Sequence, residues 1–355
     1  MSDKKKWEVL GLMSGTSLDG LDIAHIHFKK QNKLWTFELL EVETYKYDEF
    51  WFKKLSQPYD IKNTPRLNQL DIEYGDFLGE KCNFFCKKHQ INPKFICSHG
   101  HTIFHQPELG YTLQVGNGQR MASKTNRVVI NNFRMQDVRL GGQGAPLVPI
   151  GDLHLFKEYN QCLNLGGFAN ISTKSESGIT AYDICPVNIV LNQIAQTLGK
   201  NFDHEGLFAR SGNLIDSLLE KLNQLGYYKA RAPKSLGKEW VNDCFNPIFE
   251  NANLDASDLL ATLTEHMAIQ IACSFKPDLK VLCTGGGAYN TYLIERIKQH
   301  STNSELIIPN QKIVEYKEAL IFGFLGVLRL EGELNCLSSV TGAQSNHSSG
   351  VICRP

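Results

Sequence analysis

The chain has 355 residues and a mass of 40.0 kDa, and 42% of its residues are hydrophobic, so it can bury a large core and we expect two domains. Lys plus Arg equal Asp plus Glu at 37 each, which leaves no general basic field to hold nucleic acid or an anionic membrane surface. No run of about 18 apolar residues occurs, and no apolar stretch of secretory length follows the basic start. We therefore expect a cytoplasmic protein whose ten scattered cysteines are reduced thiols.

The first part of the chain reads as three strands, over residues 7–12, 22–29 and 34–45, and their order predicts an antiparallel meander. The first turn, from Gly15 to Asp22, contains two glycines, two hydroxyls and two carboxylates. Glycine lets the backbone approach a ligand, hydroxyl and N–H groups donate to phosphate oxygens, and a carboxylate can hold a divalent cation. The turn therefore predicts an anion site.

The next elements have a crossover pattern. We expect, in chain order, a helix over 66–89, a short strand over 95–98 that stops at Gly100, a helix over 119–126 and a strand over 127–133. Cys82 and Cys86 lie four apart on the first helix, and we expect them in the core because no further metal ligands stand at matching spacing nearby. The glycine-rich stretch 141–146 then breaks regular structure. We place a domain boundary here, giving lobes 1–145 and 146–355.

The second half repeats this order of elements. We expect strands over 162–173, 178–185, 280–284 and 305–308, and helices over 188–198, 212–224, 259–274, 290–299 and 314–330. A second glycine turn, at Gly166 and Gly167, again lies within strand-like sequence. Two α/β lobes with mixed sheets follow from this repetition, with the cleft between them as the expected site. The polar tail beyond Ala343 is expected to be mobile.

No Gly-x-x-x-x-Gly-Lys-Ser/Thr loop occurs. The two glycine turns and the later Gly285-Gly286-Gly287 instead resemble the sugar-kinase, actin and heat-shock ATPase superfamily. Four strings are more specific: residues 13–20 (MSGTSLDG), 98–105 (SHGHTIFH), 141–149 (GGQGAPLVP) and 339–343 (SVTGA). Together they resemble the anhydro-N-acetylmuramic acid kinases along nearly the whole chain. The resemblance implies an actin-like ATPase fold, α/β, with two RNase H-like lobes around an inter-lobe cleft.

The resemblance also implies a reaction. ATP phosphorylates O6 of 1,6-anhydro-N-acetylmuramic acid while water opens the anhydro bridge, and the product is N-acetylmuramic acid 6-phosphate in peptidoglycan recycling. Such chemistry needs a phosphate clamp with Mg²⁺ and one base directed at water. The cofactors expected are ATP and Mg²⁺, and a homodimer is expected, with the late helices as its interface.

Site residues are carried over from the matching motifs. ATP and its phosphates would contact one set of residues from three turns: Gly15, Thr16, Ser17, Leu18, Asp19, Gly20, Leu21, Asp22, Gly166, Gly167, Gly285, Gly286 and Gly287. Asp19 would hold Mg²⁺, through water. His99, Gly100, Arg134 and Glu318 would contact the sugar, since a guanidinium suits its carboxylate. Arg139 is a further carboxylate partner or a solvated surface residue.

Asp183 is the expected catalytic base, because it follows a strand-like segment and matches the aspartate that the family uses on water. From the residue alone, a second role as the cap of a helix starting near Pro186 remains equally open. The chain also departs from the family here. Where the family has Asp-Thr-Gly-Pro-Gly-Asn, this sequence has Ile184, Cys185 and Val187 in place of the hydroxyl and the two glycines.

Three other functions fit the sequence less well. A nucleotide switch without catalysis would keep the glycine turns but would not need Asp183, Arg134 and Glu318. A serine hydrolase using Ser17 is disfavoured because Asp19 occupies the position of the last glycine in a nucleophile elbow. A zinc site at the three histidines of the 98–105 string is disfavoured because their spacing fits no zinc frame.

Overall fold

The computed structural model describes residues 5–176, 178–232, 234–250, 252–301 and 303–355. The chain divides into two compact units: unit 1 comprises Met1–Phe156 and Tyr316–Pro355, and unit 2 comprises Lys157–Glu315. The sequence suggested a division after residue 145 with all later residues in the second lobe. In the structure the last forty residues pack with unit 1 instead, because β12 (Val351–Cys353) pairs with β6 (Val128–Asn131).

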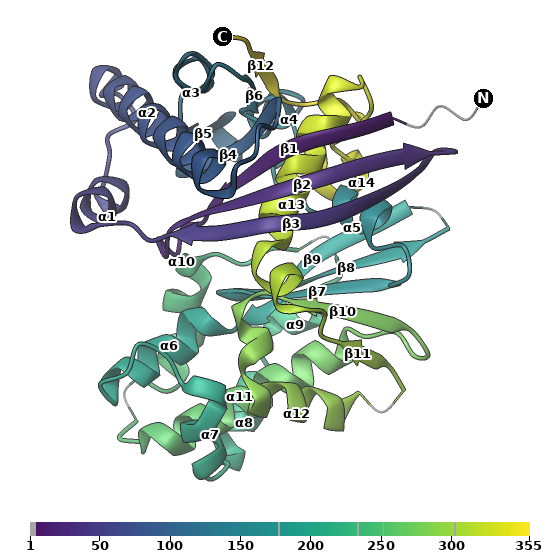
Figure 1. Cartoon of the computed structure of the whole chain (residues 1–355). Helices are drawn as coiled ribbons and strands as arrows, with labels where there is room; N and C mark the ends of the chain where they lie inside the picture. Colours follow the sequence, from purple (N-terminus) through teal and green to yellow (C-terminus); the bar gives the residue numbers. More distant parts are fainter. Residues whose placement is uncertain (1–4, 177, 233, 251, 302) are drawn as a thin grey trace. The chain divides into compact units, whose positions relative to one another are not determined.

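Unit 1 contains β1 (Lys5–Ser14), β2 (Leu21–Gln31), β3 (Leu34–Tyr45), α1 (Glu49–Ser56), α2 (Thr64–His89), β4 (Phe95–Gln106), β5 (Tyr111–Val115), α3 (Gly118–Thr125), β6, α4 (Met135–Arg139), α5 (Pro149–Leu155), most of α13 (Gln311–Leu330), α14 (Ser338–Thr341) and β12 (Figure 1). Its sheet has the order β12-β6-β4-β1-β2-β3, with β5 on β4. The meander β1-β2-β3 is antiparallel, as predicted, while β4 and β6 run parallel to β1.

Alternation along β1 directs its side chains to the two faces of this sheet. Leu10 and Leu12 lie in one core with apolar residues of α2, whereas Gly11 faces α13. A Cβ on Gly11 would collide with the carbonyl of Ala319, so only glycine lets the helix approach this closely. Helix α13 thus lies tightly against the strand that leads into the first glycine turn.

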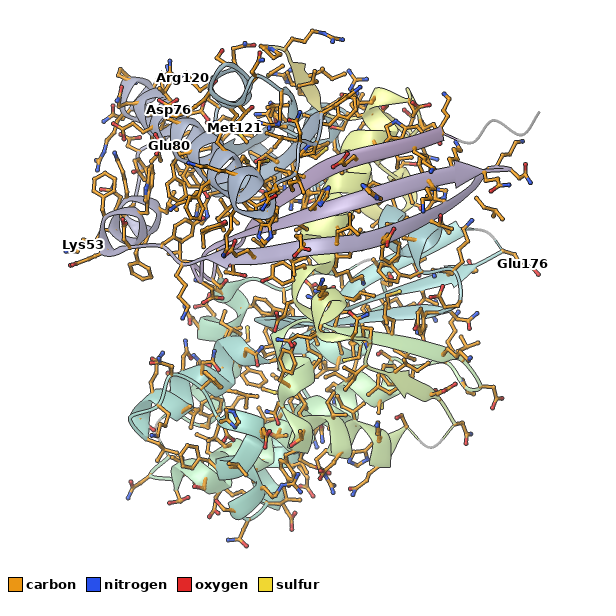
Figure 2. The ribbon with its side chains drawn as sticks, viewed as in Figure 1. Lys53, Asp76, Glu80, Arg120, Met121 and Glu176 are labelled. Atoms are coloured by element: carbon orange, nitrogen blue, oxygen red, sulfur yellow. The ribbon has the colours of Figure 1, made fainter. Side chains whose placement is uncertain are left out.

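Helix α3 packs beside α2, and Figure 2 labels Asp76 and Glu80 of α2 and Arg120 and Met121 of α3. Met121 is fully buried in the core that α2 covers. At the surface, Arg120 donates from Nε and Nη2 to the Asp76 carboxylate at 3.0 and 2.7 Å, and Lys124 pairs with Glu80 at 2.5 Å. The buried side chains of Met121, Ala122 and Thr125, together with these two ion pairs, therefore hold the crossover helix in place.

Unit 2 contains β7 (Gln161–Leu165), β8 (Phe168–Ser175), β9 (Gly178–Pro186), α6 (Asn188–Thr197), α7 (Leu207–Ser211), α8 (Asp216–Asn223), α9 (Gly226–Lys229), α10 (Lys238–Trp240), α11 (Ala256–Cys273), β10 (Lys280–Thr284), α12 (Thr291–His300) and β11 (Glu305–Ile307) (Figure 1). Its sheet has the order β11-β10-β7-β8-β9. The pairs β7-β8 and β8-β9 are antiparallel, and β10 lies parallel to both β7 and β11.

The two sheets share one plan. Each starts with a three-stranded antiparallel meander, and each adds two parallel strands beside the first strand of that meander. This is the RNase H-like strand order, so the predicted α/β class with a mixed sheet in each half is confirmed. No helix of the described residues is both long enough and apolar enough to cross a membrane.

Three expectations about local structure were wrong. Strand β4 does not stop at Gly100 but continues to Gln106, where it pairs with β5, a strand that the sequence did not predict. The helix expected from residue 212 begins at Asp216. The tail beyond Ala343 is not a loose polar segment: Ser349 is fully buried and donates from Oγ to the carbonyl oxygen of Phe133 at 2.5 Å.

Candidate active site

The first glycine turn joins β1 to β2 and exposes its polar side chains. Thr16, Ser17 and Asp19 are exposed, and within the described residues none of their side chains makes a hydrogen bond. Leu18 has a φ of 60° and donates its N–H to the carbonyl of Gly15 at 3.2 Å, which closes the turn. The turn therefore holds its shape through the backbone and leaves two hydroxyls and a carboxylate available to a ligand.

Gly20 and Asp22 fix the end of this turn to β3. Gly20 has a φ of 156°, and a Cβ there would lie 2.6 Å from the carbonyl oxygen of Tyr45. Asp22 accepts a hydrogen bond from the hydroxyl of Thr44 at 2.6 Å. Leu21, which was also expected to contact ATP, is a core residue, so its side chain is not available to a nucleotide. Its expected role is therefore limited to its backbone.

His99 and Arg134 lie together in unit 1. Arg134 donates from Nε to His99 Nε2 at 3.0 Å and from Nη1 to the carbonyl of Gly144 at 2.8 Å. Because Nε2 accepts, the ring proton sits on Nδ1, 2.9 Å from the carbonyl oxygen of Gly100. Burial, and next the positive charge of Arg134, hold the pKa of His99 well below its usual value. A neutral imidazole thus orients the guanidinium.

Glu318 approaches the same cluster from α13. It stands one turn before Phe322, whose ring lies 5.8 Å from the Arg134 guanidinium carbon. The surrounding protein raises the pKa of Glu318 by desolvation, and the charges of Arg134 and Lys317 oppose that shift. The side chain is nevertheless exposed and, among the described residues, takes part in no hydrogen bond or ion pair. An accessible carboxylate near a guanidinium suits a polar ligand that carries both donors and an acid.

Ser14 and His101 belong to this site, although sequence reasoning did not place them in it. Ser14 is the last residue of β1, and its hydroxyl bonds to His101 Nδ1 at 2.8 Å and to the hydroxyl of Tyr47 at 2.6 Å. The backbone of Ser14 also interacts with His99. Parallel pairing of β1 with β4 brings these residues together, with Ser14 opposite His101. A correct register for these two strands would have identified both residues.

In unit 2, Asp183 lies on β9, the edge strand of the sheet. The N–H of Leu236 donates to Asp183 Oδ2 at 2.9 Å, while Oδ1 has no partner among the described residues. Burial raises the pKa of Asp183, and the Leu236 N–H lowers it in part. The alternative role as a helix cap is excluded, because the N-cap of α6 is Val187 and no side chain caps that helix.

The sheet register places a row of polar residues across four strands. Thr284 on β10 pairs with Asn164 on β7, which pairs with Asn170 on β8, which pairs with Asp183. Both asparagines are half-buried, and their side chains make no hydrogen bond within the part of the chain that the structure describes. Sequence reasoning missed them as site residues, because only the strand register shows that they share a row with Asp183.

The two glycine turns of unit 2 lie side by side. A Cβ on Gly285, whose φ is 86°, would lie 2.7 Å from Asn164 Oδ1, and one on Gly287 would lie 2.7 Å from the Cβ of Leu165. Gly286, in contrast, faces open space. The carbonyls of Gly166 and Gly167 accept N–H groups from the start of α6, at distances of 2.8 to 3.3 Å. The structure thus joins two motifs that are about 120 residues apart in the sequence.

The departures from the family motif are core residues. Ile184 stands in a β-bulge, since Asn170 pairs with Asp183 and Ala169 with Cys185. Ile184, Cys185 and Val187 are all buried in the hydrophobic core of unit 2. A bulge changes the direction of neighbouring side chains. The apolar replacements therefore anchor the strand end next to Asp183, and their side chains contribute no polar contact.

The expected residues thus form one group in each unit. Unit 1 brings together the first turn, His99, Gly100, Arg134 and Glu318, and unit 2 brings together Gly166, Gly167, Asp183 and Gly285 to Gly287. Arg139 is exposed and has no partner among the described residues. Ser17 has no hydrogen-bonded histidine, and its turn joins two strands where a nucleophile elbow joins a strand to a helix, which argues against a serine hydrolase.

Comparison with known proteins decides the family. The model of the family described as anhydro-N-acetylmuramic acid kinase matches residues 7–355. The chain belongs to the anhydro-N-acetylmuramic acid kinase family. A relative of that name from Crocosphaera subtropica is 34% identical over 98% of both chains, and one from Aliivibrio fischeri is 34% identical over 97% of this chain and 98% of its own. The family and the enzyme class, a kinase, are as the sequence predicted.

The solved structures add only a distant similarity. A hexokinase from Schistosoma mansoni, complexed with glucose, matches 90% of this chain and 85% of its own at 10% identity, with a TM-score of 0.40. A similarity this weak says nothing about the site.

Proposed function

We propose that this member of the family transfers the terminal phosphoryl group of ATP to O6 of 1,6-anhydro-N-acetylmuramic acid while water adds at C1. The bond between C1 and the bridging oxygen breaks, that oxygen takes the phosphoryl group, and the products are ADP, N-acetylmuramic acid 6-phosphate and one proton. Family membership supports the substrate and the use of ATP. The environment of Asp183 supports the hydrolytic half of the reaction.

Asp183 is suited to act on the water because its two oxygens differ. The Leu236 N–H occupies Oδ2 and fixes the plane of the carboxylate, while Oδ1 is left to accept a proton. A pKa raised by burial makes the carboxylate a stronger base than an exposed aspartate. This single observation carries the proposal that Asp183 is the catalytic base.

The glycine turns are assigned to the nucleotide. In the first turn, Gly15 to Asp22 would contact the phosphates through N–H and hydroxyl groups. Gly166 and Gly167 would contact them from unit 2, where the N–H of Gly167 has no partner among the described residues. Gly285 to Gly287 would lie against the adenosine. The support is local: each turn leaves polar groups or open space where a ligand can approach.

Mg²⁺ would be held near Asp19. That carboxylate is exposed on the turn and makes no hydrogen bond within the described residues, as befits a group that meets the ion through water. The ion would supply neutralisation of phosphate charge. The sugar would lie at His99, Gly100, Arg134 and Glu318, where the guanidinium suits its carboxylate and Glu318 suits its hydroxyl or amide donors.

The location and assembly of the enzyme are proposed with this function. None of the ten cysteines, all of which lie in the described residues, forms a disulfide, which suits a reducing compartment such as the cytoplasm. The proposed assembly is a homodimer through the late helices, and sedimentation of the purified chain at several concentrations tests it. A species of monomer mass at every concentration would contradict the dimer.

The function itself is tested by coupling ADP release to the sugar. Purified chain with ATP and Mg²⁺ should release ADP only when 1,6-anhydro-N-acetylmuramic acid is present, with one phosphosugar formed for each ADP. In labelled water, the reducing sugar should gain one solvent oxygen in the same turnover. ADP release without phosphosugar, or ligand-dependent binding of a protein partner in place of turnover, would favour the nucleotide switch and overturn the proposal.

A further inference from the structure

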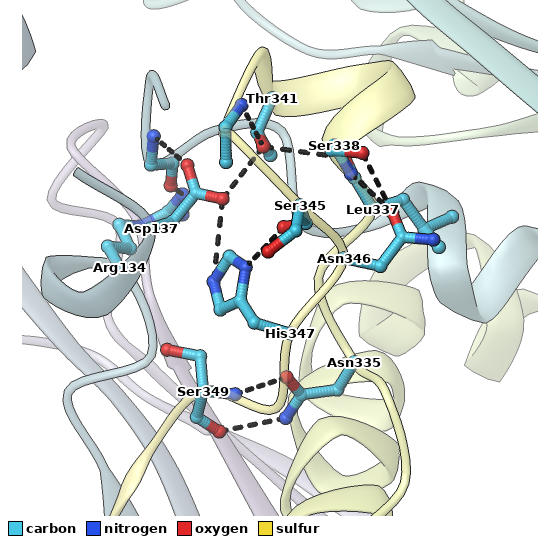
Figure 3. A network of polar contacts seen from close by, with 12 residues as sticks. Arg134, Asp137, Asn335, Leu337, Ser338, Thr341, Ser345, Asn346, His347 and Ser349 are labelled. Carbon is cyan, nitrogen blue, oxygen red and sulfur yellow. Dashed lines mark hydrogen bonds and ion pairs between the residues drawn. The ribbon is translucent and has the colours of Figure 1, made fainter. Parts of the chain in front are cut away.

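A buried cluster of three chemically different side chains lies in unit 1 beside Arg134, and none of the three is assigned to ATP or the sugar. Asp137 comes from α4, Cys336 from the segment after α13, and His347 from the C-terminal segment. Figure 3 shows the Asp137 carboxylate and the His347 ring facing each other. Their exposed fractions are 0%, 2% and 7%. One carboxylate oxygen, the thiol sulfur and one ring nitrogen all lie within 4.8 Å of one another. No role in the proposed reaction uses them.

The ring of His347 has one nitrogen satisfied and one not. Nδ1 lies 3.1 Å from the carbonyl oxygen of Ser345, which only accepts, so Nδ1 carries a proton. Nε2 is buried and makes no hydrogen bond to any residue that the structure describes, yet it lies 3.5 Å from Asp137 Oδ1. Two electron-rich atoms this close need a cation, which is either a second proton on the ring or a metal ion.

The separation of 3.5 Å favours the metal ion. A charge-assisted hydrogen bond from an imidazolium to a carboxylate would bring the two atoms to about 2.7–2.9 Å. Two ligands of one tetrahedral zinc ion, each bonded at about 2.0–2.1 Å, stand roughly 3.3–3.5 Å apart. The observed distance between Nε2 and Oδ1 therefore matches a shared metal better than a shared proton.

The partners of Asp137 and His347 are those expected around metal ligands. The N–H of Gly144 donates to Asp137 Oδ2 and the hydroxyl of Thr341 donates to Oδ1, both at 2.7 Å. A ligating histidine usually donates its other ring N–H to a carbonyl, as His347 does to Ser345. The Asp137 carboxylate and the His347 ring are thus oriented by the protein before any ion binds.

The backbone holds Cys336 opposite His347. Cys336 and His347 are cross-strand partners that exchange both backbone hydrogen bonds, at 3.0 and 3.2 Å. Next to them, Asn335 donates from Nδ2 to the carbonyl of Ser349 at 2.8 Å and accepts from the N–H of Ser349 at 2.6 Å (Figure 3). A site that is already formed costs little conformational entropy when it binds.

We propose that Asp137, Cys336 and His347 bind a zinc ion that fastens the C-terminal segment to α4. Thiolate, imidazole and carboxylate together suit zinc more than Mg²⁺ or Ca²⁺, which prefer oxygen ligands alone. On binding, the Cys336 thiol gives its proton to solvent and the sulfur bonds the ion. The fourth position of the tetrahedron is left for water.

This site would also position the sugar-binding arginine. Gly144 donates its N–H to Asp137 and accepts from Arg134 Nη1, so the loop between them joins both side chains. A Cβ on Gly142 would collide with Asp137 Oδ2, which shows how closely this loop follows the carboxylate. Zinc bound to Asp137 would hold that loop, and with it the direction of the guanidinium, without contacting the substrate.

The test is metal binding by the full chain without ATP or sugar, so its outcome is independent of the proposed reaction. The chain is stripped with a chelator, dialysed and titrated with Zn²⁺ and separately with Co²⁺ in excess Mg²⁺. We expect one equivalent of each ion, with a thiolate-to-cobalt charge-transfer band in the near ultraviolet. Cys336→Ser should abolish that band and weaken zinc binding by about 100-fold or more.

Controls separate this site from other metal-binding surfaces. Cys353→Ser removes a half-buried thiol outside the cluster and should leave the zinc affinity and the cobalt band unchanged. A second cluster of possible metal ligands in the described residues consists of Glu8, His25 and His27. His27→Gln removes one member of that cluster, and the chain should still bind one equivalent of zinc. Thr341→Val keeps all three proposed ligands but removes the hydroxyl that donates to Asp137 at 2.7 Å, together with its two longer contacts to the Leu337 carbonyl and the Ala343 N–H, both at 3.4 Å. It should weaken zinc binding by about 10- to 100-fold.

Two results would overturn the proposal. One is the absence of a saturable equivalent in the stripped wild-type chain while its circular dichroism and melting temperature remain unchanged. The other is a zinc equivalent and a cobalt band that persist in Cys336→Ser. The wild-type titration needs no variant, so a substitution that fails to fold cannot hide the first result, and Thr341→Val gives a second readout should Cys336→Ser not fold.

Discussion

Asp183 has one oxygen held and one oxygen available, and this difference predicts what Asp183→Asn does. The amide keeps an oxygen that can accept from Leu236, so the fold and nucleotide affinity should be preserved. It cannot take a proton from water, so turnover should fall by about 10²- to 10⁴-fold, the usual contribution of a general base. Steady-state rates with saturating ATP and sugar measure this loss.

The matched control is Asp243→Asn, an exposed aspartate in the same unit, which should keep normal turnover. Turnover in Asp183→Asn within a few-fold of wild type would remove Asp183 from the mechanism.

The same substitution should make unit 2 more stable at neutral pH. Burial raises the folded-state pKa of Asp183 above the ordinary value of about 3.9, so ionisation costs folding free energy. That cost is absent below the unfolded pKa, grows as the pH rises through the folded pKa, and is complete above it. Asp183→Asn should therefore melt higher than wild type at pH 7, and the gain should vanish below about pH 4. A gain that is equal at both pH values would refute the burial penalty.

Arg134 uses two of its nitrogens within the protein, and Nη2 has no partner among the described residues. Arg134→Lys replaces a planar fork with a single ammonium, which cannot hold His99 and Gly144 and also reach a carboxylate. Loss of one charge-assisted hydrogen bond, about 1.5–3 kcal/mol, should raise the KM for the sugar by about 10- to 100-fold. The KM for ATP should not change.

Arg139→Lys serves as the control, since Arg134 directly precedes α4 and Arg139 is the exposed last residue of that helix. If both substitutions changed the sugar KM equally, the position of Arg134 would carry no special role.

At the scale of elements, substitutions of two neighbouring glycines in one turn should have opposite effects on stability. A Cβ on Gly285 would lie 2.7 Å from Asn164 Oδ1 and 2.8 Å from the Leu165 carbonyl oxygen, and its φ of 86° disfavours any other residue. Gly285→Ala should therefore displace the turn from β7, cost about 1–3 kcal/mol of stability and weaken ATP binding. Gly286→Ala meets nothing and should preserve stability.

Calorimetric binding of ATP and thermal melting of the two variants measure this difference. Equal stability of Gly285→Ala and Gly286→Ala would show that the turn is not held against β7.

Local sequence predicted most elements, and it failed where distant contacts decide. The β1-β2 hairpin was predictable because alternating apolar residues flank a turn of glycines. The continuation of β4 was not, because Gly100 has a φ of 74° and a Cβ there would collide with the Val115 carbonyl, so the strand passes this glycine only beside β5. Ser349 looked solvated, yet its partner Phe133 lies more than 200 residues away.

The candidate site was predicted to a similar extent. The family resemblance gave Asp183 and Arg134, but the hydrogen bonds that orient them come from Leu236 and His99, which only the folded chain brings near. The cluster of Asp137, Cys336 and His347 left no signal in the sequence either, since its ligands come from segments about 200 residues apart.

At the scale of the whole molecule, two sheets with the same strand order place equivalent glycine turns after their first strands, β1 and β7. A repeated fold therefore supplies two similar glycine turns, which we propose bind phosphate, while the side chains on later strands differ between the units. In unit 1 the neighbouring parallel strand β4 carries His99, and in unit 2 the edge strand β9 carries Asp183. The proposed roles are thus divided between two units that share one strand order.

Both units contain buried neutral histidines, which predicts how the molecule responds to acid. Burial lowers the pKa of His101 in unit 1 to about 4 and that of His266 in unit 2 to about 3. An unfolded histidine has a pKa of about 6.5, so below that pH the unfolded chain binds more protons than the folded chain. Stability present above pH 6.5 should therefore be lost as the pH falls towards 4, at up to about 1.4 kcal/mol per pH unit for each histidine.

Urea unfolding from pH 7.5 to 4.5 measures this slope in variants that each remove one group. His101→Gln should be less stable at pH 7, because the bond to Ser14 is disturbed, but it should lose less stability on acidification. His266→Gln should do the same for unit 2, where Asn223 and Tyr228 contact the ring at 2.7 and 2.9 Å. His204→Gln, on an exposed segment, should keep the wild-type slope. The slope of the unfolding free energy against pH reports the protons taken up on unfolding, whereas the urea midpoint at pH 7 reports the overall stability. A variant with a lower midpoint and an unchanged slope would therefore show that the histidine contributes packing alone.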